Sequence, residues 1–126
     1  MTIREVIDTV NVLKPNKISD AMKVAWLADL DQKAFDEVIL THEWPGEGEP
    51  EYTPYTGDTD EDTELIITGA NARDIYIYYL EAMIDRENAE IAKYNTTSSF
   101  YNAAYNAWCG AYNRNNRPKK QGVFRF

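Results

Sequence analysis

The sequence predicts an all-α protein, a small bundle of about four helices with a long acidic loop between the second and third helices. Two observations lead to this fold class. Apolar residues recur at helical spacing in four segments, most of them preceded by a capping residue. Between residues 42 and 64 the helical pattern disappears, and after residue 113 an extended basic tail follows. We therefore expect a helical domain over residues 1–113, with its loop region at 42–69, and a docking tail over residues 114–126.

The first predicted helix begins at a capping box. Thr2 is followed three residues later by Glu5, so each side chain can bond the backbone of the other. Pro15 ends this helix, because proline has no backbone N–H and restricts the residue before it. One helical face carries the apolar residues Ile3, Val6, Ile7 and Val10.

A second helix is predicted to run to about Thr41, and either Asn16 or Ser19 can cap its start. Its apolar stripe consists of Met22, Ala25, Trp26, Leu30, Ala34 and Val38.

The loop that follows, residues 42–64, contains three prolines, three glycines and nine acidic residues, with neither lysine nor arginine. Loops of this length are uncommon in compact domains unless they function or stay disordered. The short apolar run Leu65–Ile67 is either a strand or the anchor that returns the loop to the core. The candidate functional acids of the loop are Glu47, Glu49, Glu51, Asp58, Asp60, Asp62 and Glu64.

For the third helix, Asn71 is the predicted cap, and Asp74 completes a capping-box pattern. We expect the polar run Asn95–Ser99 to break or kink the chain before a fourth helix begins. The apolar stripe of the third helix consists of Tyr76, Leu80, Met83, Ile84, Ile91 and Tyr94.

The fourth helix is rich in aromatic residues and carries no charge from Asn95 through Asn113. Its apolar arc contains Phe100, Tyr101, Ala104, Tyr105, Trp108, Ala111 and Tyr112. The opposite face carries amides where a solvated helix normally shows Lys and Glu, which favours contact with another protein. The alternative is an ordinary core helix with a polar outer side. The candidate subunit-interface residues are Asn102, Tyr105, Asn106, Trp108, Tyr112 and Asn113.

The C-terminal tail is purely basic, whereas the remaining 113 residues hold 8 basic and 21 acidic side chains. In an extended segment, Phe124 and Phe126 lie on the same side. Such a segment can add to a sheet edge or fill a pocket of a partner, although a frayed terminus is the alternative. The candidate partner-binding residues are Arg114, Arg117, Lys119, Lys120, Val123, Phe124, Arg125 and Phe126.

Catalytic and metal-binding patterns are missing from the sequence, so we expect neither an enzyme nor a protein that needs a cofactor or a metal. His42 is the only histidine and belongs to no motif, and the lone Cys109 excludes an internal disulfide. The run Asp58–Glu64 begins like a calcium loop, but Thr63 stands where glycine is needed and Gly69 where a bidentate glutamate is needed. The net charge of −8 argues against general nucleic-acid binding. Neither a membrane span nor a signal peptide is expected.

Five segments of the C-terminal half form a recognisable pattern, namely Asp74–Asp85, Tyr94–Asn95, Phe100–Tyr105, Tyr112–Arg114 and Arg117–Pro118. In these segments the chain resembles the small helical head-tail adaptor, or connector, proteins of long-tailed bacteriophages. The resemblance implies a virion structural protein that forms a homo-oligomeric ring of about twelve subunits beneath the portal protein. The tail would dock on the portal, and packaged DNA would pass through the lumen without sequence-specific binding.

The same resemblance implies a location at the neck of the virion, between head and tail, and in the host cytoplasm before assembly. The acidic loop would face either the lumen or the next neck or head-completion protein. An alternative interpretation is a stand-alone acidic protein, such as a DNA mimic that inhibits a basic nucleic-acid-binding protein. A calcium-dependent module is a third interpretation, and it depends on the run Asp58–Glu64 alone.

Overall fold

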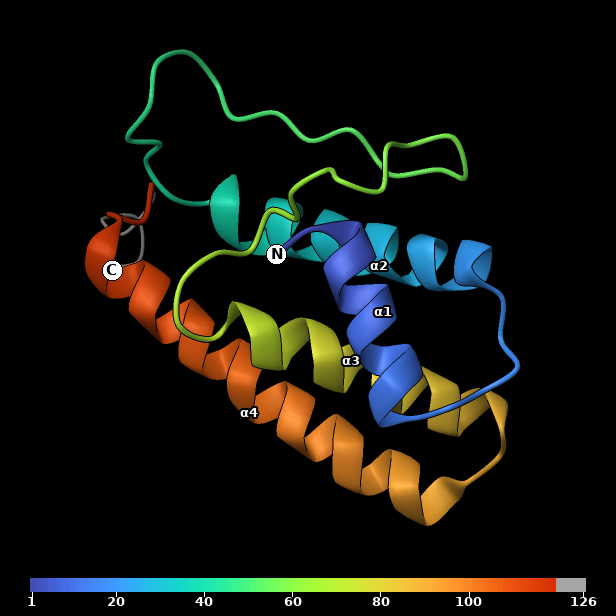
Figure 1. The fold of residues 1–126 in the computed structure, drawn as a ribbon. Helices are drawn as coiled ribbons and strands as arrows, with labels where there is room; N and C mark the ends of the chain where they lie inside the picture. Colours follow the sequence, from blue (N-terminus) through green and yellow to red (C-terminus); the bar gives the residue numbers. More distant parts are fainter. Residues whose placement is uncertain (120–126) are drawn as a thin grey trace.

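The computed structural model describes residues 1–119. This part of the chain forms no strand, and its β-type contacts are two isolated bridges. The all-α fold class is confirmed, as is the long non-helical stretch between the second and third helices, residues 40–71. The elements, in order, are α1 (Ile3–Leu13), α2 (Asp20–Ala34), the π-helical turn η1 (Phe35–Ile39), α3 (Ala72–Glu87) and α4 (Ile91–Asn115) (Figure 1).

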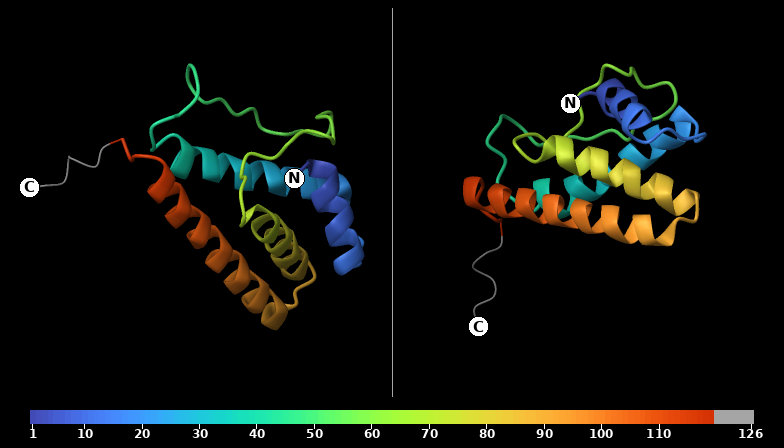
Figure 2. Two further views of the ribbon diagram at one scale, coloured as in Figure 1. Left: turned by 60° about the vertical axis from the view of Figure 1, so that its left-hand side comes forward. Right: turned by 60° about the horizontal axis from the view of Figure 1, so that its bottom comes forward.

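Helix α3 is the central helix of the bundle. It forms an antiparallel hairpin with α4, and it also contacts α1 and α2 (Figures 1 and 2). The run Leu65–Ile67 is the predicted anchor rather than a strand, because Leu65 and Ile67 are buried in this core. The largest fully buried apolar side chains are Ile3, Val6, Val10, Leu27, Leu30, Leu65, Ile67, Ile75, Tyr76, Leu80 and Ile84.

Two of the three predicted helix caps form. The Thr2 Oγ1 accepts a hydrogen bond from the Glu5 N–H at 3.1 Å, and the Glu5 carboxylate accepts one from the Thr2 N–H at 3.0 Å. The Ser19 Oγ accepts from the Met22 N–H at 3.2 Å, so Ser19 rather than Asn16 caps α2. Asn71 does occupy the predicted position just before α3, but its backbone is already helical and its side chain makes no cap hydrogen bond.

Helix α2 differs from its prediction in its buried face and its final turn. Met22 and Ala25 are exposed, because the face turned to the core is instead centred on residues such as Leu27 and Ala28. After Ala34 the helix widens into η1, where the Leu40 N–H donates to the carbonyl five residues earlier, at 2.9 Å.

The predicted break at Asn95–Ser99 was also wrong. Helix α3 ends at Glu87, and the chain turns at Ala89, whose φ of 57° is left-handed. Ile91 and Tyr94 therefore belong to α4. Within this helical run, hydroxyl groups bond to carbonyls of the preceding turn, as serine and threonine inside helices can do. For example, the Thr96 hydroxyl donates to the Ala92 carbonyl at 3.2 Å.

The aromatic stripe of α4 packs largely as predicted. Tyr101, Tyr105 and Trp108 are buried, and successive ring centroids along the stripe lie 5.8 and 5.7 Å apart. Phe100 differs from the prediction, since it is half exposed and packs against Tyr78 at the edge of the α3–α4 contact.

A buried carboxylate at Asp31, on α2, connects three parts of the chain. Its Oδ2 accepts hydrogen bonds from the Tyr55 hydroxyl at 2.6 Å and the Ile66 N–H at 3.2 Å. Its Oδ1 accepts from the hydroxyl of Tyr76, on α3, at 2.6 Å. Tyr76 in turn accepts from the Ile67 N–H at 2.8 Å. Burial raises the pKa of Asp31 above its ordinary value, although these donors act in the opposite direction.

A second buried carboxylate, Asp85 on α3, has a cationic partner. Lys14, at the end of α1, places its Nζ 2.7 Å from both carboxylate oxygens. The hydroxyl of Thr97 on α4 donates to the same group at 3.1 Å. One side chain therefore ties α1, α3 and α4 together at the end of the bundle opposite η1 (Figure 1).

Replacement of Asp31 should strongly destabilise the fold. Asp31→Ala leaves two tyrosine hydroxyls and a backbone N–H buried without an acceptor, so we expect the free energy of unfolding to fall by about 3 kcal/mol or more. Urea unfolding at neutral pH measures this change. Asp29→Ala, an exposed position on the same helix, is the matched control and should change stability by less than about 0.5 kcal/mol. Equal effects of the two substitutions would contradict the role of Asp31.

The pH dependence of stability should also reveal Asp31. Because its pKa is higher in the folded than in the unfolded chain, the unfolded chain loses this proton first as pH rises. The contribution of Asp31 is therefore full below the ordinary value of 3.8 and falls as pH rises through the folded pKa. We expect the stability advantage of the wild type over Asp31→Asn to shrink with rising pH. Urea unfolding across the acidic range tests this, and an advantage that grows with pH would contradict it.

Candidate interaction site

The acidic loop lies along α2 instead of standing away from the body (Figure 1). Two tyrosines hold it there. Tyr52 donates its hydroxyl hydrogen to the Ala28 carbonyl at 2.9 Å, and Tyr55 reaches Asp31. The two tyrosine rings meet edge to face with centroids 5.4 Å apart. The loop is therefore anchored at its middle, which its solvated composition did not indicate.

The end of the loop is fixed against the N-terminus. The Arg4 guanidinium contacts carboxylates of Glu61 and Asp62 at 3.0 Å each, and the Met1 amino group lies 3.3 Å from Glu64. These are surface ion pairs, which contribute little to stability individually. In residues 1–119, no three acidic, histidine or cysteine side chains converge to hold a metal ion. The predicted loop acids all remain exposed, namely Glu47, Glu49, Glu51, Asp58, Asp60, Asp62 and Glu64.

The base of the C-terminal tail, residues 117–119, pairs antiparallel with the start of the loop. The Glu43 N–H donates to the Arg117 carbonyl at 2.8 Å, and the Lys119 N–H donates to the Thr41 carbonyl at 2.9 Å. Pro118 lies opposite His42. Since proline has no N–H to donate, the two hydrogen bonds fall on either side of it. These two hydrogen bonds therefore fix the position and the direction of the tail base against the loop.

His42 lies buried between η1 and the end of α4. Its Nδ1 lies 2.6 Å from the Val38 carbonyl, and its Nε2 forms a short contact with the Asn113 side-chain oxygen. The imidazole also meets the Tyr112 ring edge to face, with centroids 4.9 Å apart. The sequence offered no motif for this residue, whose partner lies 71 positions away. His42 is a structural clamp between η1 and the end of α4, next to the tail base.

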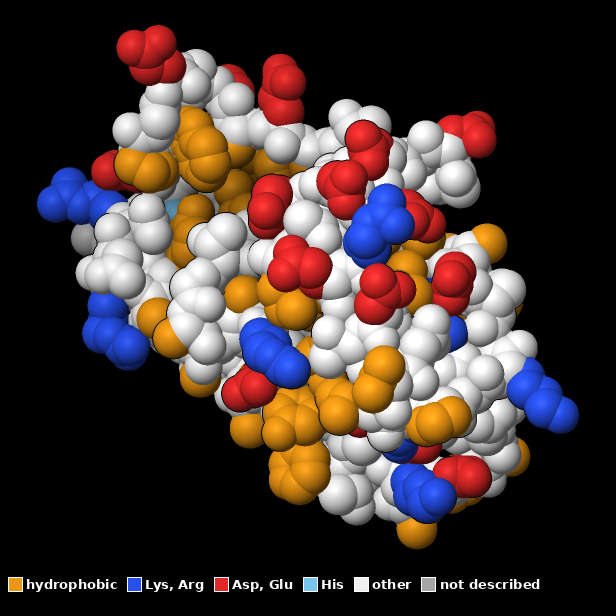
Figure 3. All heavy atoms as spheres, in the orientation of Figure 1, with side chains coloured by type: hydrophobic (Ala, Val, Ile, Leu, Met, Phe, Trp, Pro, Cys, Tyr) orange, Lys and Arg blue, Asp and Glu red, His pale blue; other side chains and the backbone are white. Residues whose placement is uncertain are grey.

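A groove of about 720 Å³ opens beside this clamp. We call it the terminal groove. Figure 3 shows apolar side chains gathered there, below the acidic loop. The Trp44 indole packs over Gly46, where a Cβ would come within 2.8 Å of the Trp44 Nε1. Trp44 remains 41% exposed. The lining includes Phe35, Ile39, Trp44, Glu51, Trp108 and Tyr112.

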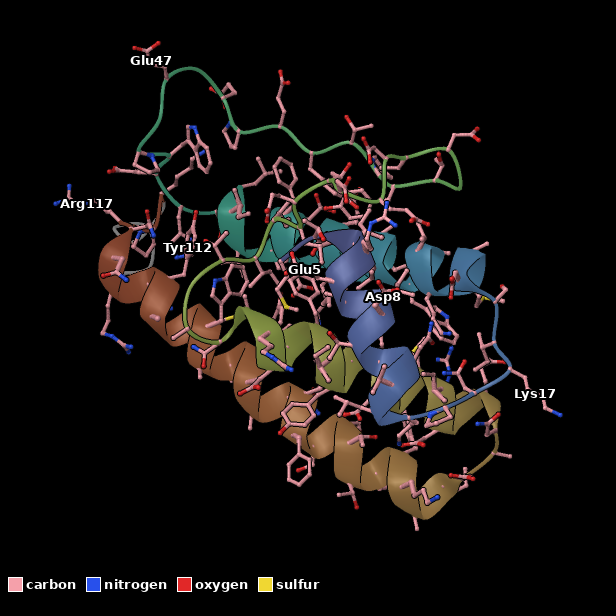
Figure 4. The ribbon with its side chains drawn as sticks, in the orientation of Figure 1. Glu5, Asp8, Lys17, Glu47, Tyr112 and Arg117 are labelled. Carbon is pink, nitrogen blue, oxygen red and sulfur yellow. The ribbon has the colours of Figure 1, made fainter. Side chains whose placement is uncertain are left out.

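Two ionisable groups near this end of α4, Tyr112 and Cys109, stay protonated and therefore neutral. Burial raises the pKa of Tyr112, and burial also raises the pKa of the Cys109 thiol, although Lys33 acts in the opposite direction. Since only the thiolate is a strong nucleophile, Cys109 is a packing residue. Figure 4 shows Tyr112 and Arg117 at the same end of the molecule as Glu47. The terminal groove therefore combines a neutral apolar lining with acidic side chains at its edge.

The structure separates the predicted subunit-interface residues into two groups. Asn102 and Asn106 are exposed on the outer face of α4. Tyr105 and Trp108 are buried in the chain's own core, and the hydroxyl of Tyr105 has no hydrogen-bond partner among residues 1–119. Tyr112 is half buried and lines the terminal groove, while Asn113 is exposed and contacts His42. The surface of α4 that a neighbouring subunit could contact is therefore smaller than the six predicted residues indicated.

The predicted tail residues also fall into separate groups. Arg114 lies in the last turn of α4, because the helix continues to Asn115, beyond the predicted boundary at residue 113. Arg117 and Lys119 are exposed in the tail base. Lys120, Val123, Phe124, Arg125 and Phe126 lie outside the described residues.

No family model matches the chain, and neither a curated protein nor a solved structure matches it with statistical significance. Within residues 1–119, no helix combines the length and the apolar character that a membrane crossing requires.

Loss of the His42 clamp should loosen the tail base. His42→Ala leaves the Val38 carbonyl and the Asn113 side chain without their partner, so we expect about 1–3 kcal/mol of destabilisation. Amide hydrogen exchange at Lys119 and Glu43 should accelerate, and NMR can follow both amides. Arg117→Ala is the control, since the tail base bonds through the Arg117 carbonyl and keeps this bond. Unchanged exchange in His42→Ala would mean that the imidazole does not hold the tail base.

Proposed function

We propose that this protein is a structural head-tail adaptor of a long-tailed phage, forming a ring under the portal and extending the DNA channel toward the tail. The observation that carries the proposal is the junction at the end of α4. The His42 clamp and the pairing of the tail base give the basic tail a fixed origin on a rigid helical body. A docking arm needs such an origin, because a defined starting point reduces the conformational entropy lost on binding.

The outer face of α4 supports contact between subunits in the proposed ring. Asn102, Asn106 and the small residues Ala103 and Ala107 are exposed there. The absence of charge from Asn95 through Asn113 lowers the cost of removing this face from water. Small side chains also allow two helices to approach closely, so a neighbouring subunit fits this surface.

The acidic loop supports a position in the channel or against the next neck protein. Its exposed carboxylates repel DNA phosphates, so packaged DNA would slide past the loop without binding. Because Tyr52 and Tyr55 anchor the loop on α2, the charges are held at a fixed place on the body.

The same exposed carboxylates favour a second candidate function, an acidic protein that occupies a basic nucleic-acid-binding protein. In that case the protein would bind such a partner in a strongly salt-dependent manner, without self-assembly. The uniformly basic tail weighs against this alternative, since it would repel a basic partner.

The adaptor role can be tested with DNA-filled heads that carry the cognate portal but lack the adaptor. We expect the full chain to co-sediment with these heads, and a chain that ends at Pro118 to lose at least about tenfold in affinity. The truncation removes only one hydrogen bond of the described body, from Lys119 to Thr41, so the free energy of unfolding should fall by about 1 kcal/mol at most.

A full-length chain with Phe124→Ser and Phe126→Ser is the matched control for charge. This variant keeps every basic residue of the tail. Loss of binding would therefore identify the two phenylalanines as the contact, whereas retained binding would identify electrostatic attraction. Failure of the intact chain to bind the heads would remove the adaptor proposal, and unfolding of the truncated chain would show that the tail belongs to the body.

A further inference from the structure

The terminal groove is an apolar surface that residues 1–119 leave open. Its volume is about 720 Å³, and Trp44 at its edge is 41% exposed. Openings of this size with an aromatic lining are typical of binding sites. Water against an apolar surface is unfavourable, so an occupant that covers the groove lowers the free energy. The aromatic side chains of the lining are Phe35, Trp44, Trp108 and Tyr112.

Contacts within the body hold the walls of the groove in place. The Tyr52 ring packs on Phe35 with centroids 5.8 Å apart, and the Tyr52 hydroxyl bonds a carbonyl of α2 at 2.9 Å. Tyr52 therefore positions its sequence neighbour, Glu51, at the groove. On α4, the rings of Trp108 and Tyr112 pack with centroids 5.5 Å apart. A groove whose walls are already fixed loses little conformational entropy when it binds a partner.

The charge at the groove is negative. Of the described residues that line it, Glu51 is the only charged one, and its side chain is exposed. Within residues 1–119, the loop forms its ion pairs at residues 61–64 instead, so they leave the Glu51 carboxylate uncompensated. Figure 4 shows Glu47 at the top of the same loop, whereas the Arg117 side chain extends away from the body. By charge complementarity, the groove favours an occupant that carries a cation.

Amide side chains in the lining suit the backbone of a peptide. Asn71, just before α3, and Asn115, the last residue of α4, both line the groove. A side-chain amide has both a donor and an acceptor, so it can pair with the N–H and C=O groups of a bound chain. An aromatic lining, an acidic residue and two amides together fit a peptide that presents an apolar ring and a basic side chain.

We propose that the terminal groove binds a segment of a partner protein in which an aromatic side chain lies next to an arginine or a lysine. The aromatic ring packs against Trp44 and Tyr112, and the cation lies toward Glu51. Aromatic and arginine side chains that enter a pocket supply much of the binding energy of protein interfaces. The inference does not depend on the proposed function, because the groove belongs to the body of the chain and binds such a segment whatever larger assembly the protein joins.

Short peptides with blocked ends test this specificity on the full-length protein. The probe is a tetrapeptide with the sequence glycine, phenylalanine, arginine, glycine. NMR follows the indole N–H of Trp44 and the backbone amide of Asn116, which both line the groove, and Trp44→Phe identifies the indole signal. We expect saturable shifts with a dissociation constant of about 1 mM or below. Binding should weaken at least about fivefold when alanine replaces the phenylalanine or glutamate replaces the arginine.

Matched variants of the protein locate the contact. Glu51→Gln should weaken binding of the arginine peptide by about threefold and leave a peptide with glutamine in place of arginine unaffected. Asp58→Asn, an exposed acid of the same loop outside the groove, should leave both peptides unaffected. Trp44→Ala should weaken both, because the phenylalanine ring loses its contact, and the Asn116 amide then serves as the signal. Circular dichroism establishes that each variant is folded.

Equal binding of all the peptides would overturn the proposal, and so would binding that does not respond to Glu51→Gln. Shifts of the groove signals that follow protein concentration rather than peptide concentration would assign the groove to a second copy. Binding that appears only after deletion of residues 120–126 would assign it to the chain's own end. Either result would also overturn the proposal. Phage heads are absent from this assay, so a failure of portal docking leaves its outcome unaffected.

Discussion

A buried carboxylate that has no cationic partner within residues 1–119 holds the loop and two helices of this fold together. Asp31 receives two hydroxyl hydrogens and one backbone N–H, so its charge is satisfied by dipoles. Each donor comes from a different segment: the middle of the acidic loop, its return at Ile66, and α3. The middle of the loop, whose acidic composition predicts a solvated segment, thereby becomes part of the core. Without this acceptor, the loop would lose the Tyr55 hydrogen bond and keep the bond from Tyr52 to the Ala28 carbonyl on α2.

Two further buried polar side chains stabilise the opposite ends of the helical bundle. At one end, Asp85 gathers α1, α3 and α4 through Lys14 and Thr97. At the other, His42 joins η1 to α4, next to the tail base. The groove and the tail origin both lie at the His42 end. The bundle therefore holds the groove and the start of the tail together at one end.

Local signals in the sequence were sufficient for the overall fold but not for the site. The caps at Thr2 and Ser19 depend on neighbouring residues and could be read directly. The break at Ala89 could not, because a left-handed alanine has no sequence signature and the hydroxyl-rich run after it resembles a turn. Asp31 and His42 were missed for a different reason. Their partners lie up to 45 and 71 positions away, and only the folded chain brings them together.

The widened turn η1 holds one residue more than a regular helical turn, because the Leu40 N–H donates to the carbonyl five residues earlier. A π-helical turn is equivalent to an α-helix with one residue inserted, and the wider turn absorbs the extra residue. The chain after η1 therefore keeps nearly the same orientation with or without that residue. A related chain that lacks one residue between Phe35 and Ile39 would thus have a regular α-helical turn there and still direct His42 toward α4.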